Sequence, residues 1–432
     1  MPAPVTTPAL AGVRTLDHRP RVILLISPAT YRAGAFLDAA SRLGLEAVRG
    51  IDLPHALADY WDVPLGLDFT RPEVAAAELA AYAAGHPVDA ILALDDSATL
   101  VAAAASARLG LPHNDPASAL AARDKFVMRQ RLAAAGVPVP TYRREPLTAD
   151  PATIAADVTY PCVVKPLRLS GSRGVIRADD PTTFVAAWER TKRLLLGEGH
   201  DPAATHILVE RFLPGIEVAL EGLLTGGELR VLALFDKPNP LDGPFFEETI
   251  YVTPSRLPAA TQQAITTRTA ESAAAIGLRH GPVHAELRVN DDGVWLIELA
   301  GRSIGGLCSS ILEFGTGITL EELILRHAVG LPLPGLERDA GAAGVMMIPI
   351  PQGGMLRAVY GQDEARAVPG ITGVEITAKL NHPLVPLPEG ASYLGFIFAR
   401  SATPAAAEAA LRQAHHFLRF TIEPTIMLRS AL

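Results

Sequence analysis

Residues 283–302 read Val-His-Ala-Glu-Leu-Arg-Val-Asn-Asp-Asp-Gly-Val-Trp-Leu-Ile-Glu-Leu-Ala-Gly-Arg, two apolar runs joined by turn-forming residues. Apolar and polar side chains alternate in the first run, so Glu286 lies on the polar face of a predicted strand. The Asn-Asp-Asp-Gly segment predicts a hairpin with a three-residue loop, 291–293, and glycine in the left-handed position. Counting back from that loop places Glu286 directly opposite Glu298, on the same face.

Two glutamates in this arrangement are a candidate metal site. Directly opposed side chains have Cβ atoms about 4.5–5.5 Å apart, so the two carboxylates repel unless a cation lies between them. Mg2+ prefers oxygen ligands and commonly binds through one or two carboxylates plus substrate phosphates. We therefore interpret Glu286 and Glu298 as ligands of Mg2+ (or Mn2+). The alternative is a solvated strand face with ordinary acidic residues.

Arg302 follows Glu298 by four residues, just beyond the predicted strand. An arginine beside a metal carboxylate suits a developing oxyanion or a transferring phosphoryl group. The alternative is a plain ion pair. Gly305 and Gly306 place no side chain near Arg302, which leaves room for a substrate of some bulk.

Two lysines upstream are candidates for phosphate binding. Lys125 lies in a helix that we predict over residues 116–136, and Lys165 closes the apolar run 160–166. A lysine at the end of a buried strand can deliver a compact positive charge to a phosphate. Lys125 taken alone would be an ordinary surface lysine.

A small Gly/Ser loop follows Lys165 at residues 170–175. Backbone N–H groups of such a loop can cradle phosphates, although a plain hairpin turn would look the same. It is not a Walker A loop, because no Gly-Lys-Ser/Thr follows. The candidate residues in it are Ser170, Gly171, Ser172 and Gly174.

Another candidate is the hinge between two predicted strands at residues 207–217. Its backbone can offer hydrogen-bonding groups to an adenine edge, and a carboxylate can bind ribose hydroxyls. The alternative is a strand turn with two exposed acids. The hinge residues are Glu210, Arg211, Phe212, Leu213 and Glu217.

The bulk composition narrows the class of protein. The 432 residues carry a net charge of −8, with 38 basic and 46 acidic residues and no basic stripe, which argues against a nucleic-acid partner. Cys162 and Cys308 make no disulfide framework, so we expect a reduced, cytoplasmic setting. No apolar run reaches the roughly 20 residues of a membrane span.

Strand–helix alternation predicts a Rossmann-like domain with a parallel sheet at residues 21–115, without a GxGxxG dinucleotide fingerprint. A tail at 1–20 is expected to be disordered. Residues 116–330 form an α+β, mostly antiparallel region that includes a small lid at about 140–212. Residues 331–432 are expected to form a closing domain.

Taken in order, these features resemble the ATP-grasp superfamily of carboxylate–amine ligases over about residues 120–310. The resemblance rests on the lysine of Arg-Asp-Lys-x-x-x-Arg, the Val-Val-Lys-Pro strand, the Gly/Ser loop, the Val-Glu-x-Phe-x-x-Gly-x-Glu hinge, and the paired glutamates with Arg302. It implies an α/β and α+β ATP-grasp fold. That fold comprises the Rossmann-like domain, a central two-part ATP-binding region and a lid-like carboxyl-terminal domain.

The resemblance also implies a role for each group. The lysines bind ATP phosphates, the Gly/Ser loop closes over them, the hinge holds adenine, and Glu217 holds ribose. The paired glutamates ligate Mg2+, and Arg302 steadies the acyl phosphate or the tetrahedral intermediate. Many members carry an asparagine as a further metal ligand where this chain has Ala300. That departure resembles the branch of bacterial L-amino-acid ligases, which make dipeptides.

The implied reaction activates a carboxylate, expected to be that of an amino acid, as an acyl phosphate and joins it to an amine. The products are a dipeptide or amide, ADP and phosphate. The alternatives are a carboxylase or formate-using ligase acting through carboxyphosphate or formyl phosphate, and a nucleotide-binding regulator without catalysis. Members of this superfamily are commonly dimers, so the resemblance also implies that a homodimer is possible.

Four further residues are candidate substrate contacts. Glu247 or Glu248 is a candidate for binding a substrate ammonium, although a solvated loop is the alternative there. Lys237 is a candidate contact for a phosphate or a carboxylate. His284 shares a face with Glu286 and is a candidate for orienting substrate or ligand.

Overall fold

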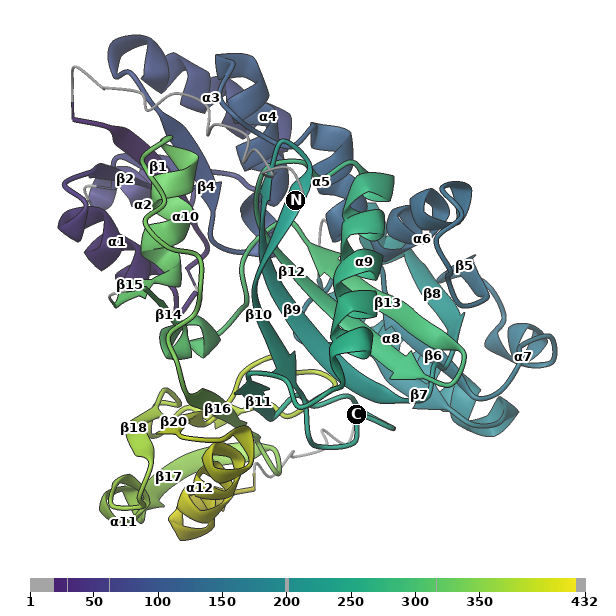
Figure 1. Cartoon of the computed structure of the whole chain (residues 1–432). Helices are drawn as coiled ribbons and strands as arrows, with labels where there is room; N and C mark the ends of the chain where they lie inside the picture. The colour runs from purple at the N-terminus through teal and green to yellow at the C-terminus, as the bar shows by residue number, and fades with distance from the viewer. Residues whose placement is uncertain (1–18, 29, 62, 199–201, 316, 425–432) are drawn as a thin grey trace, which may run out of the picture.

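A parallel sheet in the order β3-β2-β1-β4 forms the amino-terminal part of the protein. Apolar residues of β1 alternate between two cores: α3 and α4 cover one face of the sheet, and α1 and α10 cover the other (Figure 1). The elements are β1 (Arg21–Ile26), α1 (Ala33–Arg42), β2 (Glu46–Asp52), α2 (His55–Tyr60), β3 (Leu65–Leu67), α3 (Pro72–Gly85), β4 (Ala90–Ala93), η1 (Asp96–Ala98), α4 (Thr99–Leu109) and α10 (Leu320–Ala328).

The computed structural model describes residues 19–28, 30–61, 63–198, 202–315 and 317–424. Apart from Arg19 and Pro20, the tail predicted at residues 1–20 lies outside these ranges.

The helix predicted over residues 116–136 is in fact two helices, α5 (Pro116–Arg123) and α6 (Lys125–Ala134). Asp124 adopts an extended backbone between them, and its carboxylate accepts hydrogen bonds from the N–H groups of Phe126 and Val127 at 3.1 and 3.2 Å. Aspartate is a favoured helix N-cap, so the prediction of one helix was wrong at an ordinary capping residue. The break makes Lys125 the first residue of α6.

A separate antiparallel sheet in the order β5-β8-β6-β7 follows, with α7 and α8 packed against it. Its core contains Phe184 and the fully buried Trp188 of α8. The elements are β5 (Tyr142–Pro146), α7 (Pro151–Ala155), β6 (Cys162–Pro166), β7 (Ile176–Ala178), α8 (Pro181–Gly197), η2 (Pro202–Thr205) and β8 (His206–Arg211).

The central sheet is antiparallel and runs in the order β13-β12-β9-β10-β11-β16-β20-β18. Helices α5, α6 and α9 contribute to the core on one of its faces. The strands and helix are β9 (Ile216–Thr225), β10 (Glu228–Asp236), β11 (Ile250–Thr253), α9 (Ala259–Ile276), β12 (Gly281–Asn290), β13 (Gly293–Ala300), β16 (Ala342–Ile348), β18 (Ile371–Ile376) and β20 (Gly395–Ser401). This one sheet contains strands from both sides of residue 331. The domain boundary that we predicted at residue 331 stays a prediction.

Smaller elements complete the chain, most of them in its carboxyl-terminal part (Figure 1). Helix α12 packs on β16 and β20, and a short sheet in the order β19-β17-β21 lies beyond them. The remaining elements are η3 (Cys308–Ile311), β14 (Glu313–Phe314), β15 (Ile318–Thr319), β17 (Gly354–Tyr360), α11 (Gln362–Arg366), β19 (Pro383–Leu384), α12 (Pro404–Phe417) and β21 (Arg419–Glu423).

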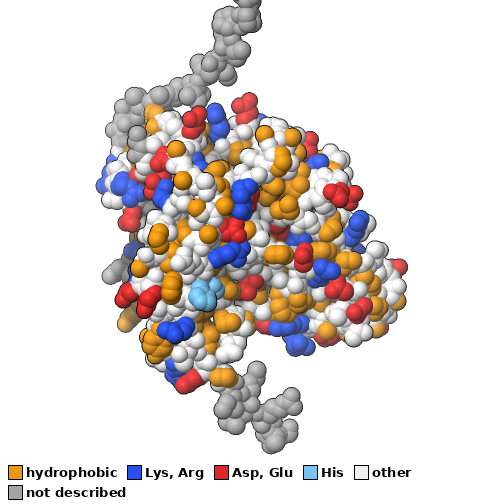
Figure 2. Space-filling model, turned by 60° about the horizontal axis from the view of Figure 1, so that its bottom comes forward, with side chains coloured by type: hydrophobic (Ala, Val, Ile, Leu, Met, Phe, Trp, Pro, Cys, Tyr) orange, Lys and Arg blue, Asp and Glu red, His pale blue; other side chains and the backbone are white. Residues whose placement is uncertain are grey.

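Figure 2 shows acidic and basic side chains interspersed over one face of the molecule. Among the helices that the structure describes, none has the length and apolar character needed to cross a bilayer.

Candidate active site

The β12–β13 hairpin pairs Glu286 with Glu298, as the sequence predicts, but by a different route. The loop is shorter than the predicted three residues, because Asn290 pairs with Gly293 instead of Val294. The Asn290 side chain tightens the turn by accepting a hydrogen bond from the Asp292 N–H at 3.0 Å, as asparagine commonly does in turns. The prediction of the loop was therefore wrong.

A β-bulge restores the register. Between the pairs Glu286–Glu298 and Leu287–Leu296, strand β13 contains one extra residue, Ile297. The Ile297 carbonyl accepts a hydrogen bond from Arg129 Nη2 at 2.8 Å. The tight turn and the bulge cancel, so both glutamates keep the same face.

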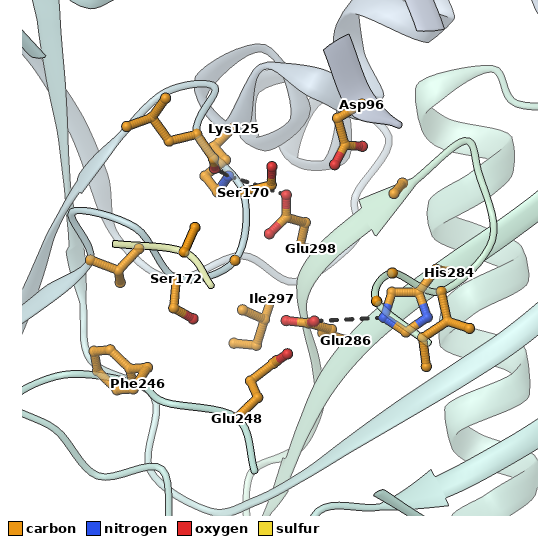
Figure 3. A pocket seen from close by; sticks show the side chains of 18 of the residues that line it. Asp96, Lys125, Ser170, Ser172, Phe246, Glu248, His284, Glu286, Ile297 and Glu298 are labelled. Carbon is orange, nitrogen blue, oxygen red and sulfur yellow. Dashed lines mark hydrogen bonds and ion pairs between the residues drawn. The ribbon is translucent and has the colours of Figure 1, made fainter. Parts of the chain in front are cut away.

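The hairpin borders a cavity of about 460 Å³ at the junction of the amino-terminal, lid and central sheets. Figure 3 shows the carboxylates of Glu248, Glu286 and Glu298 directed toward the same central space. Of the predicted site residues, all but Gly174, Lys237 and Glu247 line the cavity. Those on its wall are Lys125, Lys165, Ser170, Gly171, Ser172, Glu210, Arg211, Phe212, Leu213, Glu217, Glu248, His284, Glu286, Glu298, Arg302, Gly305 and Gly306.

Lys125 connects α6 to the acidic hairpin. Its Nζ lies 3.1 Å from Glu298 Oε1 (Figure 3). The same Nζ donates to the Leu169 carbonyl at 2.8 Å. The side chain is nearly buried, so this is not the surface lysine of the alternative interpretation.

Glu286 belongs to a buried network around Lys237. Lys237 Nζ lies 2.8 Å from Glu217 Oε1 and 3.5 Å from Glu286 Oε1, and it also pairs with Glu248. Burial alone would lower the pKa of Lys237, but the charges of the three glutamates outweigh it and raise that pKa. Lys237 is therefore a positive charge held behind the cavity wall. Glu217 also accepts from Arg288 Nε at 2.9 Å.

His284 lies between two carboxylates. Its Nδ1 is 3.1 Å from Glu221 Oε2. Its Nε2 is 3.6 Å from Glu286 Oε1 (Figure 3). Burial alone would lower the pKa of His284, but its hydrogen bonds to Glu221 and Glu286 outweigh burial and raise the pKa to about 9. Histidine at this position supplies a positive charge at neutral pH.

Lys165 is held by Glu210, which also accepts from Arg129 Nε at 2.7 Å. All three side chains are almost completely buried. Burial would raise the pKa of Glu210, but the charges of Arg129 and Lys165 outweigh it and lower that pKa. The carboxylate predicted for the adenine hinge thus also orients Lys165 in the cavity wall.

The Gly/Ser loop is attached to the carboxyl-terminal part of the chain. The Gly174 N–H donates to the Pro388 carbonyl at 2.8 Å, and Arg173 Nε donates to the Glu389 carbonyl at 2.7 Å. Gly174 has φ +72°, and a Cβ there would lie 2.7 Å from Pro166 Cγ, so glycine is required for packing. Gly174 shapes the loop from outside the cavity.

Arg302 reaches the amino-terminal sheet. Its Nη2 lies 2.6 Å from Asp96 Oδ2, and its Nη1 donates to the Ser303 carbonyl at 2.9 Å. Burial would raise the pKa of Asp96, but the charge and hydrogen bond of Arg302 outweigh it and lower that pKa. The plain ion pair expected as the alternative does exist, and the arginine still lines the cavity.

Several wall residues were absent from the sequence prediction. Tyr31 and Asp96 lie just after the strands β1 and β4 of the amino-terminal sheet, and Tyr393 comes from the carboxyl-terminal part. A signal for Asp96 was present, because it lies three residues past the end of β4, at the carboxyl end of a parallel strand, where ligand sites form. No local pattern marks Tyr393.

The acidic residues fit a hard divalent cation. Glu286 and Glu298 oppose each other across the hairpin. Glu217, Glu248 and Glu286 each offer a carboxylate oxygen within 4.8 Å of the others, but these three already surround the Lys237 ammonium. Oxygen ligands of this kind, together with substrate phosphates, suit Mg2+. Ala300 lines the cavity and offers no ligand atom from its side chain.

Comparison with known proteins identifies the fold. Three family models match in chain order: an ATP-grasp N-terminal domain at residues 37–113, an ATP-grasp domain at 158–311, and L-amino acid ligase C-terminal domain 2 at 346–423. The crystal structure of an L-amino acid ligase from Bacillus licheniformis is similar with a TM-score of 0.79 and 25% identity, covering 94% of this chain and 100% of that one.

Curated relatives agree with this result. A D-alanine–D-alanine ligase from Aromatoleum aromaticum is 32% identical over 222 residues, which is 46% of this chain and 67% of that protein. An alanine–anticapsin ligase from Bacillus subtilis is 27% identical over 291 residues, which is 63% of this chain and 60% of that protein. The expected fold class is confirmed, and the chain belongs to the ATP-grasp superfamily of carboxylate–amine ligases and resembles the bacterial L-amino-acid ligases.

Proposed function

We propose that this enzyme uses ATP to activate the carboxylate of an amino acid as an acyl phosphate and joins it to the amine of a second substrate. The products are a dipeptide or amide, ADP and phosphate. The observation that carries the proposal is that Glu286, Glu298, Lys125, Lys165 and Arg302 share one cavity. These are the charges that both halves of such a reaction require.

The first half forms the acyl phosphate. A substrate carboxylate oxygen bonds to the γ-phosphorus while the bond to the β,γ-bridging oxygen breaks, and ADP takes the electron pair. Lys125 and Lys165 offer positive charge to the phosphates. Glu286 and Glu298 would hold Mg2+, which when bound neutralises charge on the phosphate oxygens.

The second half forms the new C–N bond. The amine nitrogen attacks the carbonyl carbon, the carbon–oxygen bond to phosphate breaks, and inorganic phosphate leaves. The nitrogen releases a proton to solvent or to a base. We assign Arg302 the stabilisation of the oxyanion that develops on the carbonyl oxygen, because its guanidinium lines the cavity and is always charged.

ATP binding is assigned to the lid side of the cavity. Residues 211–213 line it through the hinge, and the rings of Phe212 and Phe246 stack with centroids 6.2 Å apart. We assign the hinge backbone to the adenine edge and Glu217 to the ribose. The loop at 170–175 then covers the phosphates.

An amino-acid substrate is supported by two features of the cavity wall. Glu248 is a cavity carboxylate that accepts from Tyr251 Oη at 2.8 Å, and we assign it to the substrate ammonium. Tyr31 and Tyr393 both contact Phe396, beside Gly306, which gives this corner an aromatic wall. A Cβ at Gly305 would have no atom within 4 Å, so a substrate with a large side chain has room there.

An ATP-turnover screen tests the proposal. ADP release is measured with Mg2+ and each amino acid alone, then with pairs, and the products are weighed by mass spectrometry. We expect ADP release to require an amino acid, and a dipeptide or amide mass when an amine acceptor is present. Stimulation by bicarbonate or formate instead would replace this function with the alternative. Failure of every amino acid to stimulate turnover would refute it.

A further inference from the structure

The carboxyl ends of β1 and β4 bring two loops of the amino-terminal sheet to the cavity. The sheet order places β2 on one side of β1 and β4 on the other, so these ends flank the point where the strand order reverses. Ligand sites of open parallel sheets form there. The two loops are tied together by Asp95, which accepts from Ser27 Oγ at 2.9 Å and from Thr30 Oγ1 at 3.0 Å.

These loops hold the Arg302–Ser303 dipeptide from two directions. Asp96 accepts from Arg302 Nη2 at 2.6 Å. Arg32 donates to Ser303 Oγ and, at 3.3 Å, to the Ser303 carbonyl. The Ser303 carbonyl also accepts from Arg302 Nη1 at 2.9 Å. Both terminal nitrogens of the Arg302 guanidinium therefore donate a hydrogen bond, one to Ser303 and one to Asp96.

Arg302 needs such support because its own segment is irregular. Residues 301–305 lie between β13 and η3 and belong to neither helix nor strand. Behind them, Glu221 accepts from the Ile304 N–H at 3.0 Å. Asp96 and Arg302 are 206 positions apart in the chain, and both side chains are mostly buried, 20% and 14% exposed.

We infer that Asp96 is a positioning residue that aims the Arg302 guanidinium at the reacting carbonyl, while Arg32 fixes the backbone at Ser303. The inference rests on the catalytic role proposed above for Arg302. It makes the amino-terminal sheet a working part of the active site. A misplacement of a catalytic group by about 1 Å can lower the rate about 100-fold.

A double-mutant cycle with Asp96→Asn and Arg302→Met tests it. The rate of ligation is measured with the amino-acid pair that the screen identifies. Asp96→Asn should lower kcat by about 100-fold and change the KM for ATP by less than about threefold. If Asp96 acts through Arg302, the double variant should lose no more than Arg302→Met alone. The matched control is Glu73→Gln, which breaks an exposed ion pair with Arg108 on the same sheet's helices and should keep the wild-type rate.

Other outcomes are distinct. A wild-type protein without amino-acid-stimulated turnover would refute the proposed function, and the positioning role with it. An active wild type with multiplicative losses in the double variant, or with a wild-type rate in Asp96→Asn, would overturn only the positioning role. If Asp96→Asn fails to fold by circular dichroism, Ser303→Ala replaces it, and a kcat-selective loss is again required.

Discussion

Glu286 faces Glu298 across the β12–β13 ladder because Ile297 is an extra residue that offsets a turn one residue shorter than predicted. The shorter turn and the bulge thus cancel, and the two glutamates that we propose as metal ligands stay opposed. Arg129 is bonded to this bulge, because the Ile297 carbonyl accepts a hydrogen bond from its guanidinium. Bulges next to active sites commonly re-aim side chains in this way.

Glu298→Gln should retain ATP binding and lose turnover. The amide removes one negative ligand for Mg2+, so we expect kcat to fall by about 10²–10³-fold. Isothermal titration should show a nucleotide affinity within about tenfold of wild type. Asp292→Asn, in the exposed turn of the same hairpin, is the control and should turn over normally. Wild-type turnover by the Glu298→Gln variant would exclude Glu298 as a ligand of the proposed Mg2+.

Arg129→Met should destabilise the fold strongly. Arg129 is fully buried and donates to both oxygens of Glu210, so its loss leaves a buried carboxylate with less compensation. Breaking a buried pair of this kind costs about 3–5 kcal/mol. Urea unfolding should show that loss, whereas Arg108→Met, in an exposed pair with Glu73, should change stability by about 1 kcal/mol or less. Equal losses in the two variants would contradict the prediction.

Gly305→Val should narrow the substrate range without unfolding the protein. Gly305 lines the cavity, and a Cβ there meets nothing within 4 Å, so we expect the new side chain to take up cavity space. We expect the KM for bulky amino acids to rise about tenfold or more, with smaller ones little affected. Gly306→Val is the contrast, because φ is +60° and a Cβ would lie 3.1 Å from the Phe396 ring. That variant should lose thermal stability, and an unchanged preference in Gly305→Val would exclude this corner as the substrate pocket.

His327 should make the protein sensitive to acid. Burial, with the stacked His280 ring 4.4 Å away, lowers the pKa of His327 to about 4. In the unfolded chain the His327 ring binds a proton near pH 6.5, whereas in the folded protein it does so only near pH 4. The contribution of the neutral ring to the free energy of unfolding is therefore fully present above pH 6.5 and is lost as the pH falls toward 4. The loss is up to about 3 kcal/mol. His327→Gln should flatten the fall in stability over that range, and the exposed His55→Gln should not.

Glu389→Gln should weaken ATP binding by loosening the lid. Glu389 accepts from Arg190 Nε at 2.5 Å and from Nη2 at 2.9 Å, which holds the lid helix α8 against the segment that also anchors the Gly/Ser loop. The pair is about 40% exposed, so its contribution is at most about 1 kcal/mol, or about fivefold in affinity. Asp179→Asn, which breaks an exposed pair with Arg177 in the lid, is the control. Equal KM values for ATP in both variants would rule out the contact as a latch.

The sequence by itself determined the local pieces. Period-two alternation predicted the hairpin and its facing glutamates, and strand–helix alternation predicted the parallel sheet. The sequence prediction failed at two helices. The capping bonds of Asp124 divide the helix that we predicted over residues 116–136. Helix α9 was not predicted, because its buried face includes the polar residues Thr269 and Ser272. Periodicity reports only which face is apolar, and it says nothing about caps or small polar core residues.

Only the tertiary structure decided what the site residues touch. Asp96 reaches Arg302 across 206 positions, Lys125 reaches Glu298 across 173, and Arg190 reaches Glu389 across 199. No local pattern encodes such pairs, because backbone propensity acts within a few residues, whereas charge pairing depends on how separate sheets pack. The sequence therefore specified which charged groups the protein has. Packing decided which of them face each other, and burial strengthens the interaction of those pairs that it removes from solvent.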